Sequence, residues 1–449
     1  MWSIETRWFD VAVVMSLFAI GNIVFGHFEQ HKPSWRRLLK VAIFLAVVLT
    51  LAQTAGRSWA YGILAVPFPA VVYIHFWWLP KHGINGWTGE PRDKYLALLT
   101  RVRNRGPVWR SWVGLFVVAA AASVTAAARA QPTDAPRNDL PQPYRTTRDW
   151  GQLPAGVKWA AVTAVEPAPD GSIYVIHRCL ANSCAGRSEA PILKYDAKGT
   201  LLKSWGEGMF IFPHGATVDR EGNLWVTDAR GENGKGHQVF KFSPDGKVLA
   251  TLGKAGVSGS TPGLFDQPTD VLVAPNGDVF VTDSHRNGKN NHVVKFTRDG
   301  KYIKEWGKKG SGRGEMSEPH TIAMDSRGRL FVGDRENNRI VIYDQDGEVL
   351  DEWRQFGRPS GIFITKDDTI YVADSESGPD TGAHELLGIK KGIRIGSARD
   401  GKVVAFIEDS ESTTPDHSGA EGVGVDAQGN VYGAVVRRQM LERHVRTPR

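Results

Sequence analysis

The pattern of apolar and polar positions changes about a third of the way along the chain. Long apolar runs fill most of the first 130 residues, whereas short apolar runs separated by polar turns follow from about residue 150. Runs of about 18 or more apolar residues are typical of membrane-spanning helices, and short alternating runs bounded by turn residues are typical of β-strands. The pattern therefore predicts a helical first part that faces a membrane and an all-β second part.

Three apolar runs predict three membrane-spanning helices over residues 1–106. The runs are Val11–Phe28, Val41–Ala55 and Ser58–Pro80, and the second is short for a span unless it begins at Leu38. The loops after the first and third runs are rich in Lys and Arg, which places both loops in the cytoplasm by the positive-inside rule. Buried core helices of a soluble domain are the alternative for runs of this length.

A fourth apolar run, Trp112–Ala128, lies within residues 107–130 and has the basic flank and small-residue exit of a secretory signal. It forms either a fourth span or an internal signal that is cleaved after Ala130. In both cases the following chain lies outside the cytoplasm, so we expect an inner-membrane protein whose larger part is periplasmic or extracellular. The proline-rich residues 131–150 are expected to form a linker and a closing strand.

Residues 151–449 contain six similar segments, each with a polar turn, a short apolar strand, and further strands and hairpin turns. A period of roughly 40–60 residues with four short strands is typical of a β-propeller, so the segments predict a six-bladed β-propeller. Because the last segment ends near Arg449, a strand near Arg145–Leu153 is expected to complete the sixth blade. The turns lie at Asp170-Gly171, Glu221-Gly222-Asn223, Asn276-Gly277-Asp278, Arg327-Gly328, Asp367-Asp368 and Gln428-Gly429-Asn430.

The charge follows the same division of the chain. The whole sequence has 55 Lys and Arg against 48 Asp and Glu, a formal charge of +7. Residues 1–130 hold 14 basic and 5 acidic side chains, a local +9, and the other 41 basic and 43 acidic side chains give −2. A nucleic-acid-binding module gathers its positive charge on the folded domain. The predicted partners are therefore a membrane and a small-molecule or peptide substrate, with no nucleic acid.

One position recurs at the same offset in all six segments, eight residues before the turn glycine or its equivalent in the fifth segment. It is expected at the start of the innermost strand of each blade, beside the central channel. In alternate blades it carries a histidine, a histidine and a glutamate, which predicts a site for zinc or another divalent metal with open coordination positions. The other three positions are expected to line the channel, and a wet polar channel without metal is the alternative. The six residues are Thr163, His214, Thr269, His320, Ser360 and Glu421.

Several motifs carry a resemblance to a known family. These are Phe212-Pro213-His214-Gly215, Val226-Thr227-Asp228, His237-Gln238-Val239-Phe240, Pro319-His320 and Asp334-Arg335-Glu336-Asn337. The run resembles the lyase domain of peptidylglycine α-amidating enzymes, a six-bladed propeller of the NHL-repeat type, and it is dense from about Trp159 to Ile342. The resemblance implies a central zinc held by three histidines, and cleavage of a peptidyl α-hydroxyglycine into a peptide amide and glyoxylate.

The resemblance also assigns roles to single residues. His214 and His320 match two zinc ligands of the family, and Arg178 and Arg335 match its active-site arginines, which suit a carboxylate or an oxyanion. A surface or inter-blade ion pair is the alternative role for each arginine.

Three positions depart from the family's pattern. Glu421 replaces the third zinc histidine, which still permits metal binding but lowers the charge of the site. Gly422 replaces an aspartate that the family uses for structural calcium, which puts calcium in doubt here. His285 replaces the tyrosine base, and histidine takes a proton readily near neutral pH.

Cys179 and Cys184 directly follow Arg178 and are expected to form a small disulfide loop in an oxidising compartment, with free or metal-bound thiols as alternatives. The principal hypothesis is an extracytoplasmic zinc-dependent carbon–nitrogen lyase. A non-catalytic NHL propeller that binds a peptide, glycan or protein partner is the main alternative. A calcium-dependent lactonase-type hydrolase ranks below both, because the axis residues offer histidines.

Overall fold

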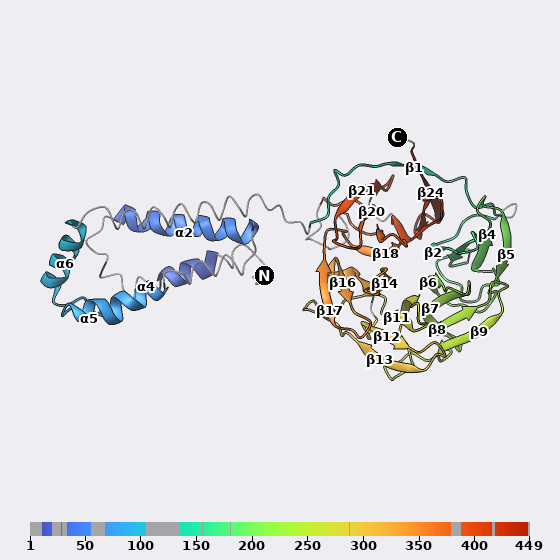
Figure 1. The fold of residues 1–449 in the computed structure, drawn as a ribbon, viewed down its shortest axis with the longest axis horizontal. Coiled ribbons are helices and arrows are strands. Elements are labelled where there is room, and N and C mark those ends of the chain that lie inside the picture. The colour runs from blue at the N-terminus through green and yellow to red at the C-terminus, as the bar shows by residue number, and fades with distance from the viewer. Residues whose placement is uncertain are drawn as a thin grey trace. The chain divides into compact units, whose positions relative to one another are not determined.

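A computed structural model gives the fold of the chain, which divides into two units, Met1–Thr133 and Asp134–Arg449 (Figure 1). Each unit is considered by itself. The structure describes residues 11–19, 28, 34–54, 68–104, 135–153, 157–179, 181–286, 288–378, 388–414 and 418–447.

The described part of the first unit is helical. Residues 11–19 form a helical segment, and the longest helix, α2, has 21 residues. Among the helices that the structure describes, none is long and apolar enough to cross a membrane. The predicted spans at Val11–Phe28 and Ser58–Pro80 lie partly outside the described residues, and Trp112–Ala128 lies wholly outside them. The elements are α2 (Ser34–Thr54), α4 (Phe68–Tyr73), η2 (Ile74–Trp78), α5 (Leu79–Lys81) and α6 (Arg92–Asn104).

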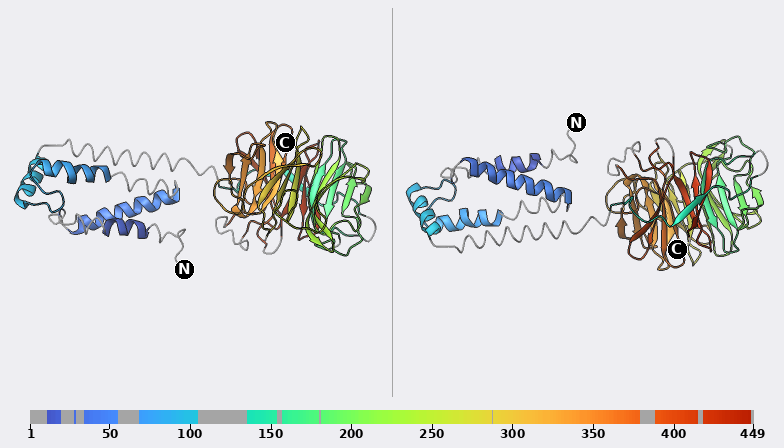
Figure 2. Two further views of the ribbon diagram at one scale, coloured as in Figure 1. Left: turned by 90° about the horizontal axis from the view of Figure 1, so that it is seen from below. Right: turned by 90° about the horizontal axis from the view of Figure 1, so that it is seen from above.

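The second unit is the expected all-β six-bladed propeller, seen down its ring in Figure 1 and from its edge in Figure 2. Each blade is a four-stranded antiparallel sheet. Blade one is β2 (Val162–Pro167), β3 (Ile173–His177), β4 (Ile192–Tyr195) and β5 (Leu201–Trp205). Blade two is β6 (Pro213–Val218), β7 (Leu224–Glu232), β8 (Lys235–Phe242) and β9 (Val248–Gly253). Blade three is β10 (Pro268–Val273), β11 (Val279–Asp283), β12 (His292–Phe296) and β13 (Tyr302–Trp306).

The remaining blades follow the same order along the chain. Blade four is β14 (Pro319–Met324), β15 (Leu330–Asp334), β16 (Arg339–Tyr343) and β17 (Val349–Trp353), with the 3-10 turn η3 (Arg335–Asn337) after β15. Blade five is β18 (Pro359–Ile364), β19 (Thr369–Asp374), β20 (Gly392–Ser397) and β21 (Val403–Glu408). Blade six is β22 (Ala420–Val425), β23 (Val431–Val435), β24 (Met440–Arg446) and β1 (Tyr144–Thr147).

Blade six closes the ring with strands from distant parts of the sequence. β1 pairs antiparallel with β24, so that Tyr144 lies opposite Arg446. The closing strand is shorter than the predicted Arg145–Leu153, because the chain leaves the sheet after Thr147. The Trp150 ring then packs between blades six and one, 4.9 Å from the ring of Tyr432 and 5.3 Å from that of Tyr195. This contact buries the joint between first and last blades.

The core lies between neighbouring blades. The second strands β3, β11, β15 and β23 are buried along their whole length, because another blade covers each of their faces. The outermost strands, such as β5 and β13, keep exposed residues because they lie at the rim. Consecutive apolar residues in the second strands are therefore the sequence signature of this packing.

Candidate metal centre

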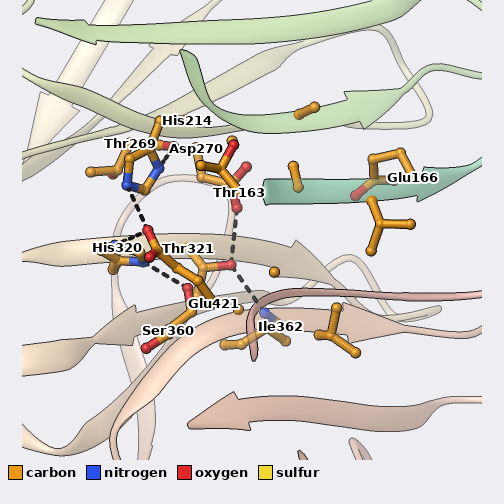
Figure 3. A pocket seen from close by; sticks show the side chains of 17 residues that line it. Thr163, Glu166, His214, Thr269, Asp270, His320, Thr321, Ser360, Ile362 and Glu421 are labelled. Carbon is orange, nitrogen blue, oxygen red and sulfur yellow. Dashed lines mark hydrogen bonds and ion pairs between the residues drawn. The ribbon is translucent and has the colours of Figure 1, made fainter. Parts of the chain in front are cut away.

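A β-bulge near the start of each innermost strand positions the six recurring residues. The pairing between first and second strand skips the recurring residue alone in five blades, and skips His214 together with Gly215 in blade two. A bulge leaves its residue out of the ladder and turns the side chain to a new direction. Six bulges at one phase therefore bring side chains from all six blades to the axis, where they line one cavity (Figure 3).

Buried aspartates fix the chain before several of these bulges. Each lies in a second strand opposite the start of the first strand, and accepts hydrogen bonds from backbone N–H groups just ahead of that first strand. Asp228 accepts from the N–H of Ile211 at 3.0 Å and from that of Phe212, and Asp283 accepts from the N–H of Asp266 at 2.9 Å. Equivalent bonds are made by Asp334 to Ser317 and by Asp374 to Arg358. The sequence did not predict these hydrogen bonds, although an aspartate recurs in the second strand of several segments.

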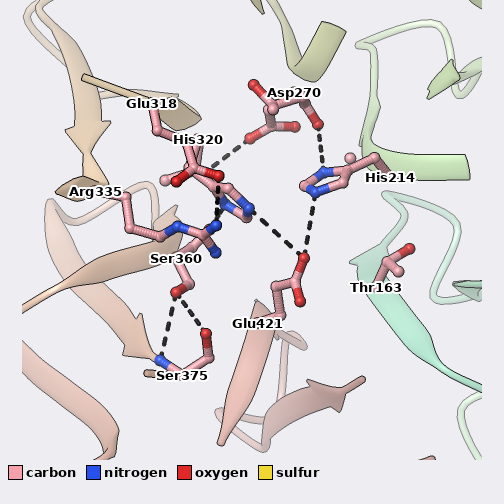
Figure 4. A network of polar contacts seen from close by, with 12 residues as sticks. Thr163, His214, Asp270, Glu318, His320, Arg335, Ser360, Ser375 and Glu421 are labelled. Carbon is pink, nitrogen blue, oxygen red and sulfur yellow. Dashed lines mark hydrogen bonds and ion pairs between the residues drawn. The ribbon is translucent and has the colours of Figure 1, made fainter. Parts of the chain in front are cut away.

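His214, His320 and Glu421 converge as the sequence predicted from their shared phase (Figure 4). Oε1 of Glu421 lies 3.2 Å from Nε2 of His214 and 3.6 Å from Nε2 of His320. Both imidazoles also contact a backbone carbonyl through Nδ1, that of Thr269 at 2.8 Å and that of Ser360 at 2.7 Å. These carbonyls require a proton on Nδ1, so each Nε2 presents a lone pair to the cluster.

His285 joins this cluster, which the sequence had not placed among the metal ligands. One ligand atom from each of His214, His285, His320 and Glu421 lies within 4.8 Å of all the others. The His285 ring lies 4.9 Å from that of His214 and 5.5 Å from that of His320. It enters from the chain that follows β11, so the phase of the first strands gave no signal for it. Nδ1 of His285 is buried and has no hydrogen-bond partner among the described residues.

Burial and charge set the protonation of the cluster. Burial is the main cause that lowers the pKa of His214 and holds the pKa values of His285 and His320 well below the usual range, and the charge of Arg335 adds to this. Burial alone would raise the pKa of Glu421, but the charge of Arg178 opposes this effect, and the pKa lies well below its usual value. The histidines are therefore neutral and the glutamate ionised, which are the forms that bind metal.

The donor atoms fit a divalent cation better than they fit one another. Nε2 of His214, Nε2 of His320 and Oε1 of Glu421 are all buried and lack hydrogen-bond partners in the described structure. A lone pair facing a lone pair at these distances is unfavourable, and an unpaired buried polar group costs about 1–3 kcal/mol. A cation among these atoms removes the conflict. Nitrogen and carboxylate donors suit zinc, and three protein ligands leave a position open for substrate.

Arg178 lies beside the cluster with one unpaired donor. Its guanidinium stacks on Phe212, 3.7 Å from the ring centre, while Nε donates to the carbonyl of Pro213 and Nη1 to Oδ1 of Asn182. Nη2 is buried, has no hydrogen-bond partner in the described structure and lies 3.6 Å from Oε1 of Glu421. Burial lowers the pKa of Arg178 to about 10, so it stays charged at neutral pH.

The loop after Arg178 contains the disulfide between Cys179 and Cys184, whose Cα atoms lie 5.2 Å apart. Both cysteines are buried, and Cys179 has a left-handed backbone with a φ of 49°. The cross-link holds the chain in a tight loop directly behind the arginine.

Arg335 is paired with carboxylates that the sequence did not single out. Its Nη2 donates to Oε1 of Glu318 (Figure 4), and Nη1 lies 3.8 Å from Oε1 of Glu376. Burial opposes its charge, but Glu376, Glu318 and Glu421 outweigh this effect and raise its pKa. Arg335 therefore supplies a permanent charge near the cluster. Its Nη2 is engaged by Glu318, whereas its buried Nε has no hydrogen-bond partner among the described residues.

The predicted channel residues line the cavity but are hydrogen-bonded to the protein (Figure 3). Oγ1 of Thr269 donates to the carbonyl of Pro319 at 2.7 Å, and the hydroxyls of Ser360 and Ser375 lie 2.7 Å apart. Thr163 is similarly turned toward the carbonyl of Ile176. These three positions therefore shape the channel. Thr269 also links blade three to blade four, whereas Ser360 and Thr163 bond within their own blades.

Comparisons with known proteins agree with this architecture. A family model described as a 6-bladed beta-propeller matches residues 262–371. The peptidyl-glycine alpha-amidating monooxygenase of Mus musculus is 41% identical over 147 residues, which are 31% of this chain and 14% of that protein. The peptidyl-alpha-hydroxyglycine alpha-amidating lyase 1 of Drosophila melanogaster is 38% identical over 172 residues, which are 34% of this chain and 30% of that protein. The NHL repeat-containing protein 3 of Homo sapiens is 29% identical over 197 residues, 43% of this chain and 54% of that protein.

The chain is a six-bladed β-propeller whose relatives include amidating lyases. It spans well under a third of the length of the mouse enzyme and just under a third of the fly enzyme. The similarity therefore supports a propeller related to those of the amidating lyases, and it does not establish the reaction.

Proposed function

We propose that this protein is a metal-dependent carbon–nitrogen lyase that cleaves an α-hydroxyglycine-type substrate and releases glyoxylate. The observation that carries the proposal is the set of buried donor atoms without partners on His214, His320 and Glu421. The relatives named amidating lyases supply the class of reaction.

The reaction is an elimination that needs no redox partner. The hydroxyl proton of the substrate is removed and its oxygen forms a carbonyl bond to carbon. The carbon–nitrogen bond breaks, and the nitrogen takes up a proton to give an amide beside glyoxylate. A divalent metal bound by His214, His320 and Glu421 would supply Lewis acidity at the hydroxyl oxygen.

Arg178 is suited to the substrate carboxylate. Its Nη2 is buried and unpaired near the cluster, and its charge persists at neutral pH. An arginine provides a fork of donors that matches a carboxylate. Its stacking on Phe212 and its bond to Pro213 orient the fork before the substrate arrives.

His285 is suited to accept the hydroxyl proton. Unlike His214 and His320, it makes no hydrogen bond from its ring to a backbone carbonyl among the described residues. Burial holds its pKa well below the usual range, so the ring is neutral and one ring nitrogen has a lone pair that can accept a proton. We therefore assign three residues to the metal and the fourth to proton transfer.

The test begins with the metal. The purified full-length chain is expected to contain one zinc per molecule, and a His214→Ala/His320→Ala variant is expected to lack it. His237→Asn is a matched control, because this histidine lies outside the cluster and asparagine tolerates its left-handed backbone. Glyoxylate release from α-hydroxyhippurate then tests the reaction. A folded, metal-free and inactive wild type would overturn the proposal and favour a non-catalytic binding propeller.

We also propose that the propeller lies outside the cytoplasm and is joined to the membrane by the first unit. The disulfide between Cys179 and Cys184 is consistent with an oxidising compartment, and the +9 charge of residues 1–130 is consistent with cytoplasmic loops beside a membrane. Alkaline phosphatase fused to the C-terminal end should be active in a bacterial host, and green fluorescent protein fused there should stay dark. The reverse pattern would overturn this placement.

A further inference from the structure

Two more arginines lie at the end of the channel that holds the metal cluster. Arg230 belongs to β7 and Arg286 follows β11. In each blade the end of the second strand lies opposite the start of the first, as Asp228 lies opposite Pro213 and Asp283 opposite Pro268. Both arginines therefore lie at the same end of the ring as His214.

An extension of blade two carries Arg230. The second strands of blades three and four end at the aspartate, whereas β7 continues to Glu232 and pairs with β8 as far as Lys235. The pairing shifts between Asp228 and Gly231, so Arg230 lies within a bulge. As with the cluster residues, a bulge turns the side chain out of the ladder.

One aromatic ring holds Arg230 in line with Arg178. The guanidinium of Arg178 lies 3.7 Å from the ring centre of Phe212, and that of Arg230 lies 3.9 Å from it. Two guanidiniums this close to one ring centre must occupy opposite faces, so Phe212 is sandwiched between them. The ring of Phe212 also lies 5.8 Å from that of His285. Phe212 thus lies between the cluster and Arg230, which is exposed.

Neither arginine has its own carboxylate partner. Arg230 makes no ion pair among the described residues, and the side chain of Arg286 is 56% exposed with one long contact, 3.9 Å to Glu376. Glu376 already serves Arg335 and Arg358. Burial and then the charge of Arg286 lower the pKa of Arg230. By contrast, Arg339 and Arg438 each contact carboxylates directly.

We propose that Arg230 and Arg286 form a second anion subsite, which binds a carboxylate in the acyl part of the substrate. This rests on the proposed function, in which Arg178 takes the carboxylate of the α-hydroxyglycine. The preferred substrate is then a dianion, with an acidic group on the residue that precedes the hydroxyglycine. Two guanidiniums at the same end of the channel supply the charge and the forked donors that such a group needs.

The kinetic test compares two substrates of the full-length holoenzyme. N-succinyl-α-hydroxyglycine carries the second carboxylate, and α-hydroxyhippurate carries a neutral acyl group. We expect kcat/KM to be about tenfold higher for the dianion, mainly through KM, which is the gain from one charged hydrogen-bonded contact. Arg230→Met and Arg286→Met should remove the preference, and Arg230→Lys should keep part of it. Arg298→Met is the control, because this exposed arginine pairs with Glu221 instead.

A binding measurement separates the subsite from the reaction. N-succinylglycine and hippurate lack the hydroxyl and cannot be cleaved, so calorimetry with them reports recognition alone. Tighter binding of N-succinylglycine that is lost in Arg230→Met supports the subsite, even if no glyoxylate forms and the lyase proposal fails. Equal binding of the two ligands, or a preference that survives both methionine variants, overturns the subsite whatever the activity.

Discussion

Nε2 of His214 lies 3.2 Å from Oε1 of Glu421, and each of these buried atoms lacks a hydrogen-bond partner among the described residues. The two come from blades two and six, and Nδ1 of His214 is engaged by the carbonyl of Thr269. The imidazole therefore cannot turn its proton toward the carboxylate without giving up that bond. The two atoms are therefore placed to share a cation, and the first two predictions test this.

Replacing the carboxylate tests its part in metal binding. Glu421→Gln keeps the size of the side chain but removes its charge, so we expect zinc affinity to fall at least about tenfold. Glu421→His restores three nitrogen ligands and should retain the metal with a more positive site. Competition with a chromogenic chelator measures both affinities. Unchanged affinity in Glu421→Gln would show that the glutamate is not a ligand.

Replacing His285 separates a ligand from a base. If His285 accepts the proton, His285→Gln should retain a full complement of zinc and lose at least about 100-fold in kcat. Metal analysis and glyoxylate release on the same preparation give both numbers. Loss of zinc from this variant would instead make His285 a fourth ligand, and the site a closed one of the kind that zinc uses for structure.

The disulfide should matter for Arg178 more than for the fold. In a Cys179→Ser/Cys184→Ser variant we expect the propeller to remain folded, with a loss of stability of about 2 kcal/mol. The loop behind Arg178 loses its cross-link, so KM should rise more than kcat falls. Thermal unfolding and steady-state kinetics check the two effects, and unchanged kinetics would show that the arginine is held by Phe212 and Pro213 alone.

The joint of the ring should be sensitive to acid. Burial lowers the pKa of His444 to about 4 against an ordinary 6.5, and Nδ1 of His444 lies 2.9 Å from Oγ1 of Thr146 in the closing strand. Below pH 6.5 His444 is protonated in the unfolded chain, whereas in the folded chain it stays neutral down to about pH 4. The free energy of unfolding is therefore undiminished above pH 6.5, and falls by about 3 kcal/mol in all as the pH is lowered through this range.

Urea unfolding at pH 7 and pH 4.5 measures this loss. His444→Gln should flatten the dependence, because glutamine does not titrate. His237→Asn should leave the dependence as it is, since this histidine lies outside the joint. A His444→Gln variant with the same pH dependence as the wild type would contradict the assignment.

The sequence predicted what the repeat determines locally. The number of blades follows from the six similar segments, and the need for a closing strand follows from the incomplete last segment. The axial position of His214, His320 and Glu421 follows from a fixed distance to each turn. His285 and Arg230 could not be predicted in this way, because each lies beyond a second strand, where the segments differ in length. Glu318 and Glu376 were missed for a different reason, because their roles depend on neighbours from other blades. The helices of the first unit have no repeat, and apolar runs alone did not establish spans there.

The sixth blade has a consequence for the order of assembly. Glu421 lies in β22, and this sheet is complete only when β1 pairs with β24. Two of the three metal donors can therefore be in place while the ring is still open, but the third is fixed last. Under the proposed function, a newly made propeller should gain its affinity for metal when the ring closes, so that metal uptake would report a finished ring.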